Sequence, residues 1–353
     1  MPKILILKPS SLGDVVQALP VLRLIKRHLP QSRVFWWIED NLAPLLESDP
    51  DLAGVVPFHR QRWAKPGNWL KLWRTVRWMR EEGFDWVIDL QGLARSSAFG
   101  WLANARGFIG LDSPREGARG FYDIAVRRAS FHTHAVDWYL GVLPRLGVPA
   151  GADFQWLPPR PEVAEGLRQK WPVGKDRWIS FQPGARWLNK RWPAENYSEL
   201  ARQTALAFPE LRFAILGGPE DRALGQAIAR VDEQRCLDLT GRLSLPEMVE
   251  WIRLSEAMVT NDTGPMHVAA ALGRPLVALL GPTEPCRTGP YGQINQVLQL
   301  DLPCVPCMGP RCRYVKPMEC LRALPPSAAF DALAQRLRLL RLASADGASR
   351  VVS

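Results

Sequence analysis

One segment of the sequence has residue types and an order that suit the binding of a diphosphate. Residues 260–267 read Thr-Asn-Asp-Thr-Gly-Pro-Met-His and stand between a β-type run and a helical run. Asp262, Thr263 and Gly264 therefore fall at the positive end of a helix dipole, where backbone N–H groups can bind phosphate oxygens. His267 lies one turn further and can donate to the same anion. A lone histidine is more often structural, but the strand–loop–helix setting favours a nucleotide site.

Two further strand–loop–helix junctions carry polar groups of the same kind. Lys190 follows the run Gln182–Arg186 and can contact a diphosphate as a flexible point charge, although a surface lysine is the alternative. Glu220 follows the glycine pair 217–218 and can bond to ribose or sugar hydroxyls, or simply cap its helix. We expect both residues on the donor side of a site.

The loop Lys8-Pro9-Ser10-Ser11-Leu12-Gly13-Asp14 follows the first β-type run and places an acid at a helix start. Gly13 permits a close turn, and the helix behind it directs backbone N–H groups at whatever lies above. An aspartate here is also what an ordinary helix N-cap looks like, so position alone leaves both roles open for Asp14. The glycines of the G-x-G-x-x-G dinucleotide fingerprint are absent after this run.

Four of the six cysteines are crowded into residues 304–320 with the spacing C-x2-C-x4-C-x7-C. In a reducing compartment such a cluster favours a metal over disulfides. Four thiolates favour tetrahedral Zn²⁺ or iron, so a structural metal is possible here. The alternative is a set of reduced, partly buried thiols in a proline-rich loop. The candidate ligands are Cys304, Cys307, Cys312 and Cys320.

These loops need strands that end beneath them, and the hydrophobic pattern predicts two sets of strands. Short β-type runs alternate with helical runs, as in layers of parallel α/β structure. The expected strands are 3–8, 33–38, 54–58, 85–90 and 107–109, then 178–182, 212–216, 236–239, 257–260 and 275–280. The expected helices are 14–29, 68–82, 194–207, 219–231, 245–254, 264–272 and 327–342. In the second helix, Leu72, Trp73, Val76 and Met79 fall on one apolar stripe.

A stiff and turn-rich stretch at residues 157–176 separates the two sets. We therefore expect an α/β protein of two Rossmann-like, doubly wound domains, at residues 1–165 and 175–325. Ligands should lie in a cleft beyond the carboxyl ends of their strands. Residues 326–343 are expected to form a C-terminal helix, and residues 344–353 a disordered tail.

The composition of the 353 residues, 47% hydrophobic and 23% charged, is that of a globular protein and excludes a disordered one. A formal net charge of +10 indicates an acidic partner, such as a phosphorylated substrate, an anionic membrane or nucleic acid, or merely a solvated basic surface. No apolar run reaches the ~18–20 residues that span a bilayer, and no signal-peptide cleavage pattern is present. These features predict a cytoplasmic protein.

Four segments resemble the ADP-heptose:lipopolysaccharide heptosyltransferases of glycosyltransferase family 9. They are SSLGD at 10–14, DLQGL at 89–93, PGARWLNKRWP at 183–193 and NDTGPMHVAAALGRP at 261–275. The likeness covers nearly the whole chain and implies the GT-B fold, with the C-terminal helix returning toward the first domain. The opening loop and residues 91–96 look more like heptosyltransferase I, whereas similar cysteine clusters occur in heptosyltransferase II-like members.

The resemblance also implies a reaction and the residues that carry it. An acceptor hydroxyl, deprotonated by Asp14, attacks the anomeric carbon of ADP-heptose with inversion, and no catalytic metal is required. Lys190 matches the family's phosphate-binding lysine, and Glu220 is a weaker match on the donor side. The nucleotide-sugar segment is matched by Asp262, Thr263, Gly264 and His267.

The acceptor that the family implies is the acidic Kdo and heptose inner core on lipid A, at the inner face of the cytoplasmic membrane. Residues 59–80 interleave cations, which suit phosphates and Kdo carboxylates, with tryptophans that can touch a membrane interface. Alternatively, Trp69 and Trp73 join the core stripe and some arginines merely cover a helix. The expected acceptor-binding residues are Ser10, Ser11, Gly13, Arg60, Arg62, Lys65, Gln91 and Arg95.

Other functions fit parts of the sequence. A family 9 enzyme can use another nucleotide sugar or modify a protein, and a non-catalytic nucleotide-sugar sensor would not need Asp14. A basic nucleic-acid-binding protein with a four-cysteine metal site explains the charge and the cysteines. It does not explain three separate phosphate-type loops, so we expect no nucleic-acid partner.

Overall fold

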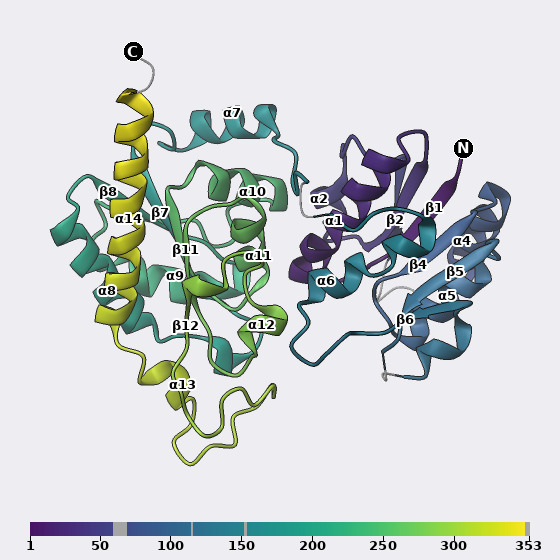
Figure 1. Cartoon of the computed structure of the whole chain (residues 1–353). Coiled ribbons are helices and arrows are strands. Elements are labelled where there is room, and N and C mark those ends of the chain that lie inside the picture. The colour runs from purple at the N-terminus through teal and green to yellow at the C-terminus, as the bar shows by residue number, and fades with distance from the viewer. Residues whose placement is uncertain (59–68, 114–115, 152–153, 350–353) are drawn as a thin grey trace. The chain divides into compact units, whose positions relative to one another are not determined.

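The computed structural model describes residues 1–58, 69–113, 116–151 and 154–349. The chain divides into two compact units, Met1–Pro158 and Pro159–Ser353. Each unit is built around one parallel sheet with helices on its faces (Figure 1).

The sheet of the first unit has six parallel strands in the order β3-β2-β1-β4-β5-β6. Its strands are β1 (Lys3–Leu7), β2 (Arg33–Glu39), β3 (Gly54–Phe58), β4 (Trp86–Asp89), β5 (Gly107–Leu111) and β6 (Ile124–Val126). Its helices are α1 (Leu12–His28), α2 (Ala43–Leu46), α4 (Trp69–Glu82), α5 (Ala94–Leu102) and α6 (Ala135–Leu140). The central strand β1 is a continuous apolar run, Ile4 to Leu7, because helices cover both faces of a parallel sheet.

The sheet of the second unit repeats this arrangement in the order β12-β11-β10-β7-β8-β9. Its strands are β7 (Arg177–Gln182), β8 (Leu211–Ile215), β9 (Cys236–Asp238), β10 (Ala257–Asn261), β11 (Leu276–Leu279) and β12 (Val297–Leu298). Its helices are α7 (Pro161–Lys170), α8 (Ala194–Ala207), α9 (Arg222–Ala229), α10 (Leu245–Leu254), α11 (Gly264–Ala271), α12 (Pro285–Thr288), α13 (Glu319–Arg322) and α14 (Pro326–Ser349). The two parallel sheets confirm the predicted α/β class of two doubly wound halves.

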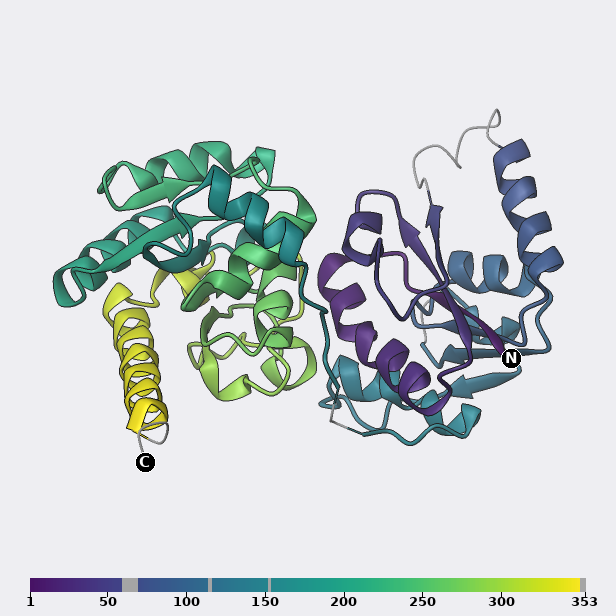
Figure 2. The ribbon, with the colours of Figure 1, turned by 90° about the horizontal axis from the view of Figure 1, so that it is seen from above.

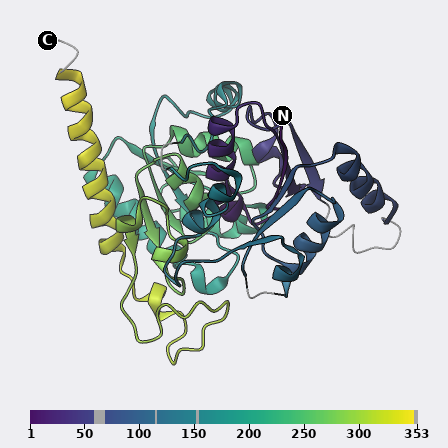
Figure 3. The same ribbon diagram turned by 45° about the vertical axis from the view of Figure 1, so that its right-hand side comes forward.

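Helix α14 belongs to the core of the second unit. Its buried residues Leu333 and Leu337 join the hydrophobic cluster of that unit, and the helix packs along α8 (Figures 1 and 3). The helix ends at Ser349, so it includes residues 344–349, which the sequence analysis assigns to a disordered tail. Alanines 345 and 348 are strong helix formers, which is consistent with the extra turn and a half. Residues 350–353 lie outside the described residues.

The prediction that Trp73 belongs to the core is wrong. Leu72 and Val76 of α4 pack against the hydrophobic cluster of the first unit and Met79 is buried within it, but the Trp73 side chain is 56% exposed. At 100° per residue, Trp73 lies about 100° around the helix from Leu72, which turns its ring away from the sheet. The guanidinium of Arg77 covers that ring instead, 5.5 Å from its centroid.

Each of the two sheets has one position at which the order of its strands reverses. In each order, the chain moves outward from the first strand in one direction and then returns to the fourth strand on the other side, between β1 and β4 and between β7 and β10. In open α/β sheets, ligands bind beyond the carboxyl ends of the strands at this switch point. The loops after β1, β4, β7 and β10 are therefore the candidate ligand loops of the two units.

Candidate active site

Asp14 lies in the first turn of α1, at the switch point of the first unit, and its side chain is 42% exposed. Its Oδ2 accepts hydrogen bonds from the Ser11 backbone N–H at 3.0 Å and from the Ser11 hydroxyl at 2.8 Å. The Tyr139 hydroxyl of α6 donates to Oδ1 at 3.4 Å. Asp14 is therefore not the N-cap that the alternative expected, because Ser11 holds that position and Asp14 is the third residue of the helix, bonded back to the Ser11 N–H. In that position it presents an oriented and accessible carboxylate.

A buried lysine stands behind this carboxylate. Lys8, the first residue after β1, is 3% exposed and donates from Nζ to the Leu90 carbonyl at 3.0 Å. The same Nζ lies 3.9 Å from Asp14 Oδ1 and 5.0 Å from the centroid of the Tyr139 ring. Burial lowers the pKa of Lys8, but Tyr139 and Asp14 more than offset it, so the pKa is raised above its ordinary value. A cation is therefore held permanently beside Asp14, where it favours the ionised carboxylate.

The loop after β4 is organised by a second carboxylate. Asp89 is fully buried and accepts from the backbone N–H groups of Gln91 and Gly92 and from the Ser96, Ser97 and Tyr122 hydroxyls. Burial raises the pKa of Asp89, and these donors act in the opposite direction. Gly92 has a φ of +65°, a conformation that glycine adopts without strain. The network fixes Gln91, whose buried Oε1 has no hydrogen-bond partner among the described residues.

In the second unit, the loops after β7 and β10 meet through an ion pair. Lys190 Nζ lies 2.5 Å from Asp262 Oδ2, and the Thr283 hydroxyl donates to the same oxygen at 2.5 Å. Lys190 also lies 4.8 Å from the centroid of the Trp187 ring. The Lys190 side chain is 17% exposed, whereas the Asp262 side chain is 6% exposed. The pair therefore presents an ammonium group, and not a carboxylate, to an incoming anion.

The N-terminus of α11 adjoins this ammonium group. Thr263 is the N-cap residue and Gly264 is the first helical residue, while His267 lies in the first turn. The Thr263 Oγ1 is buried without a hydrogen-bond partner among the described residues. Free N–H groups at a helix start, an unpartnered hydroxyl and a lysine together form a site for a phosphate group.

Glu220, the weaker donor-side prediction, is exposed in a short 3-10 turn at Pro219–Asp221. Its neighbour Asp221 is buried instead and lies 3.5 Å from the guanidinium of Arg191, next to Lys190. Burial raises the pKa of Asp221, and Arg191 opposes this. A Cβ on Gly184 would stand 2.2 Å from the Asp221 carboxylate, so only a glycine here allows the loop after β7 to lie this close to Asp221.

The cysteine segment packs against the same loops. Asn189 donates to the Gly309 carbonyl at 2.8 Å, and the Met308 N–H donates to the Pro282 carbonyl at 2.7 Å. Burial, followed by the proximity of the other three clustered thiols, raises the pKa of Cys320 to about 11. The thiols are thus neighbours, but the described residues contain no group of three or more His, Cys, Asp or Glu side chains arranged to hold a metal. A metal at Cys304, Cys307, Cys312 and Cys320 stays a prediction.

The remaining predicted residues divide between described and undescribed parts of the chain. Ser10, Ser11 and Gly13 lie in the loop that leads into Asp14, and Arg95 is exposed in the first turn of α5. The basic acceptor candidates Arg60, Arg62 and Lys65 lie outside the described residues.

Four polar residues of the two candidate sites were not predicted from the sequence: Lys8, Asp89, Tyr139 and Thr283. A charged residue directly at the end of an apolar strand was the available signal for Lys8 and Asp89. Tyr139 and Thr283 carry no local signal, because they reach their partners from distant parts of the chain.

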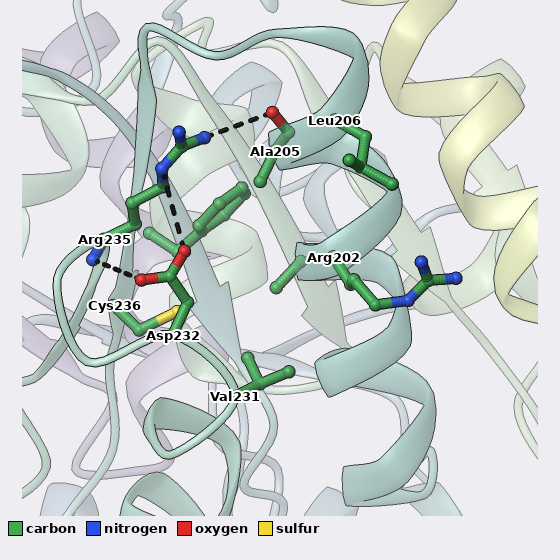
Figure 4. A pocket seen from close by; sticks show the side chains of 9 residues that line it. Arg202, Ala205, Leu206, Val231, Asp232, Arg235 and Cys236 are labelled. Atoms are coloured by element: carbon green, nitrogen blue, oxygen red, sulfur yellow. Dashed lines mark hydrogen bonds and ion pairs between the residues drawn. The ribbon is translucent and has the colours of Figure 1, made fainter.

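A hollow elsewhere in the second unit lacks the features of a catalytic site. It lies between α8 and the strands β8 and β9 and is lined by Arg202, Leu206, Val231, Arg235 and Cys236, among others (Figure 4). Arg235 is occupied by Asp232 and by the Ala205 carbonyl. Burial raises the pKa of the Cys236 thiol to about 12, so this sulfur stays protonated and unreactive at neutral pH.

Comparison with known proteins gives concordant results. Residues 69–317 match the model of glycosyltransferase family 9 (heptosyltransferase). The chain is 32% identical over 330 residues to lipopolysaccharide heptosyltransferase 1 of Pseudomonas aeruginosa, covering 88% of each chain. It is 31% identical over 318 residues to lipopolysaccharide heptosyltransferase 2 of Escherichia coli, covering 84% of this chain and 88% of the relative.

The fold of the chain is also similar to that of a solved heptosyltransferase structure. The structure of E. coli ADP-heptose heptosyltransferase II superimposes with a TM-score of 0.78 at 24% identity, over 96% of this chain and 99% of that one. The near-equal identities to a type 1 and a type 2 enzyme leave the expected likeness to heptosyltransferase I a prediction. The chain belongs to glycosyltransferase family 9, as the sequence motifs predicted, and it is a glycosyltransferase with the GT-B fold.

Proposed function

We propose that this family 9 glycosyltransferase moves a heptose from ADP-heptose to the Kdo and heptose inner core of lipopolysaccharide, working at the inner face of the cytoplasmic membrane. Supporting the proposal, its relatives are named as lipopolysaccharide heptosyltransferases of both types. The structural observation that carries it is that each unit has a switch-point site of its own, with an oriented carboxylate in the first unit and a phosphate-type site in the second.

On the donor side, Lys190 and the N-terminus of α11 are proposed to bind the diphosphate of ADP-heptose. The leaving diphosphate gains negative charge in the transition state, and fixed positive groups stabilise that charge. Asp262 and Thr283 hold the Lys190 ammonium in place before the donor arrives. His267 and the Thr263 hydroxyl add donors within the same turn, and Gly264 allows the phosphate to approach the backbone.

On the acceptor side, Asp14 is proposed to take the proton of the attacking hydroxyl. General base catalysis of this kind contributes typically ~10²–10⁴-fold. Ser11 and Tyr139 orient the carboxylate, and Lys8 keeps it ionised between turnovers. Gln91, with its unpartnered Oε1 in the loop after β4, is proposed to accept a hydrogen bond from an acceptor hydroxyl. No step of this mechanism requires a metal.

The proposal is tested by a donor and acceptor screen. Purified protein is incubated with ADP-heptose, ADP-glucose or UDP-glucose, with and without deacylated Kdo-lipid A, and the product is detected by mass. The proposal predicts addition of one heptose unit, only when ADP-heptose and the Kdo acceptor are both present. Transfer from another nucleotide sugar alone, or onto a protein acceptor, would refute the proposed substrates while leaving the family assignment intact.

A further inference from the structure

Helix α4 exposes large apolar side chains on the side that faces away from its sheet. Leu70 is 58% exposed and Trp73 is 56% exposed, and both lie in the first turns of the helix. The opposite side already supplies the packing that the fold needs, through Leu72, Val76 and Met79. Figure 2 shows α4 at the periphery of the first unit. The exposed apolar surface is therefore available to something other than the core.

A set of cations surrounds these two apolar residues. At 100° per residue, the exposed residues of α4 occupy the outer half of the helix. The cations among them are Lys71, Arg74, Arg77 and Arg80, and the single acid is Glu81. Arg77 is hydrogen-bonded to Glu81 and also covers the Trp73 ring. The outer face thus carries an excess of three positive charges beside an exposed indole and an exposed leucine.

This combination distinguishes one class of partner. Tryptophan is favoured at the boundary between lipid headgroups and acyl chains, and leucine adds apolar area that can be buried there. Arginine and lysine beside them gain about 1 kcal/mol each near an anionic lipid surface, or roughly fivefold in affinity per residue. A purely electrostatic partner such as nucleic acid would use the cations but leave Leu70 exposed. Among the described residues, no helix combines the length and apolar composition needed to cross a membrane. Helix α4 itself has 14 residues, fewer than the ~20 of a membrane span, so a lipid contact through it is interfacial.

We propose that the outer face of α4, defined by Leu70, Lys71, Trp73, Arg74 and Arg77, docks on the surface of an anionic lipid bilayer. This inference deepens the proposed function, because a lipid-anchored acceptor lies in such a surface. The docking is inferred from the exposed side chains of α4 and not from the reaction, so it can be tested without any substrate.

The test is co-sedimentation of the full chain with vesicles of phosphatidylcholine alone or of phosphatidylcholine and phosphatidylglycerol in a 7:3 ratio. The wild type should bind the anionic vesicles at least tenfold more tightly than the neutral ones. Arg74→Gln/Arg77→Gln should lower that affinity roughly 30-fold, because two charges are lost. Leu70→Ser/Trp73→Ser should lower it at least tenfold on the anionic vesicles.

Leu206→Ser is the matched control, because Leu206 is a 71% exposed leucine on α8 in the other unit. This variant should bind anionic vesicles like the wild type. Transfer to a deacylated, water-soluble acceptor should be equal in all variants, which separates a docking defect from a failure of the proposed function. The proposal is overturned if the α4 variants bind anionic vesicles like the wild type, or if Leu206→Ser loses as much affinity as they do.

Discussion

Replacement of Lys8 by methionine isolates the effect of the buried cation on Asp14. Methionine keeps a similar length and an apolar stem, so the space after β1 stays filled while the charge and the hydrogen bond to Leu90 are removed. If Lys8 keeps Asp14 ionised, activity should be lost at a higher pH on the acid side of the profile. The reason is that protonated Asp14 cannot take a proton from the acceptor.

The size of the effect follows from the geometry. Two unit charges 3.9 Å apart interact by about 4 kcal/mol at an effective dielectric constant of 20 and by about 1 kcal/mol in water. Because the Asp14 side chain is 42% exposed, solvent screening places the interaction near the lower figure, at about 1–2 kcal/mol. One pH unit corresponds to 1.36 kcal/mol, so the acid limb should move up by about one unit.

The assay is the pH profile of kcat/KM from pH 4 to 9, with the heptose product measured by mass. Lys3→Met is the control, because Lys3 lies at the other end of β1 and pairs with Glu82, away from Asp14. Lys3→Met should leave the acid limb of the profile where it lies in the wild type. If Lys8→Met loses activity by the same factor at every pH, Lys8 has only a structural role and the electrostatic reasoning is refuted.

The remaining predictions concern stability, donor binding and the thiols. Asp89→Ala should lower the free energy of unfolding by about 3–5 kcal/mol, because five donors lose a buried acceptor. Tyr122→Phe removes only one of these donors and should lower it by about 1 kcal/mol. Urea unfolding measures both losses, and equal losses would contradict the role of Asp89 as the shared acceptor. Lys190→Ala should weaken ADP binding about tenfold to a hundredfold by calorimetry, since a charged hydrogen bond is worth about 1.5–3 kcal/mol, and an unchanged affinity would remove Lys190 from the donor site. Protein purified without chelator should contain one equivalent of zinc or iron if the 304–320 cluster binds a metal, and four titratable thiols with no metal would end that prediction.

The local part of the fold was predictable from sequence because its signals are local. Apolar runs such as Ile4–Leu7 and the loops at residues 8–14 and 260–267 place strands and helix starts within a few residues of those observed. The short strands β6 and β12 escaped because runs of two or three residues carry too little alternation. Trp73 was misplaced because its type suits a core while its angular position on the helix does not.

The residues that contact Asp14 and Lys190 were less predictable from the sequence than Asp14 and Lys190 themselves. Asp14 and Lys190 stand in motifs whose type and position indicate chemistry, whereas Tyr139 joins Asp14 from 125 residues away. The sheet order, and not any local pattern, brings Lys8 to the Leu90 carbonyl through the pairing of β1 with β4. Contacts of this kind depend on the whole topology, so a single sequence indicates where the site lies but not what surrounds it.

Comparison of the wild type with Asp14→Asn shows whether Asp14 is the base of the proposed transfer. Asparagine keeps the size of the side chain and one oxygen for the Ser11 donors, so the loop should keep its shape. Initial rates of heptose transfer are measured by mass at saturating ADP-heptose and Kdo acceptor, with ADP-heptose affinity measured separately by calorimetry. If Asp14 is the base, the rate should be about 10²–10⁴-fold lower at unchanged donor affinity. A variant that transfers heptose at a near-normal rate would show that Asp14 is not the base.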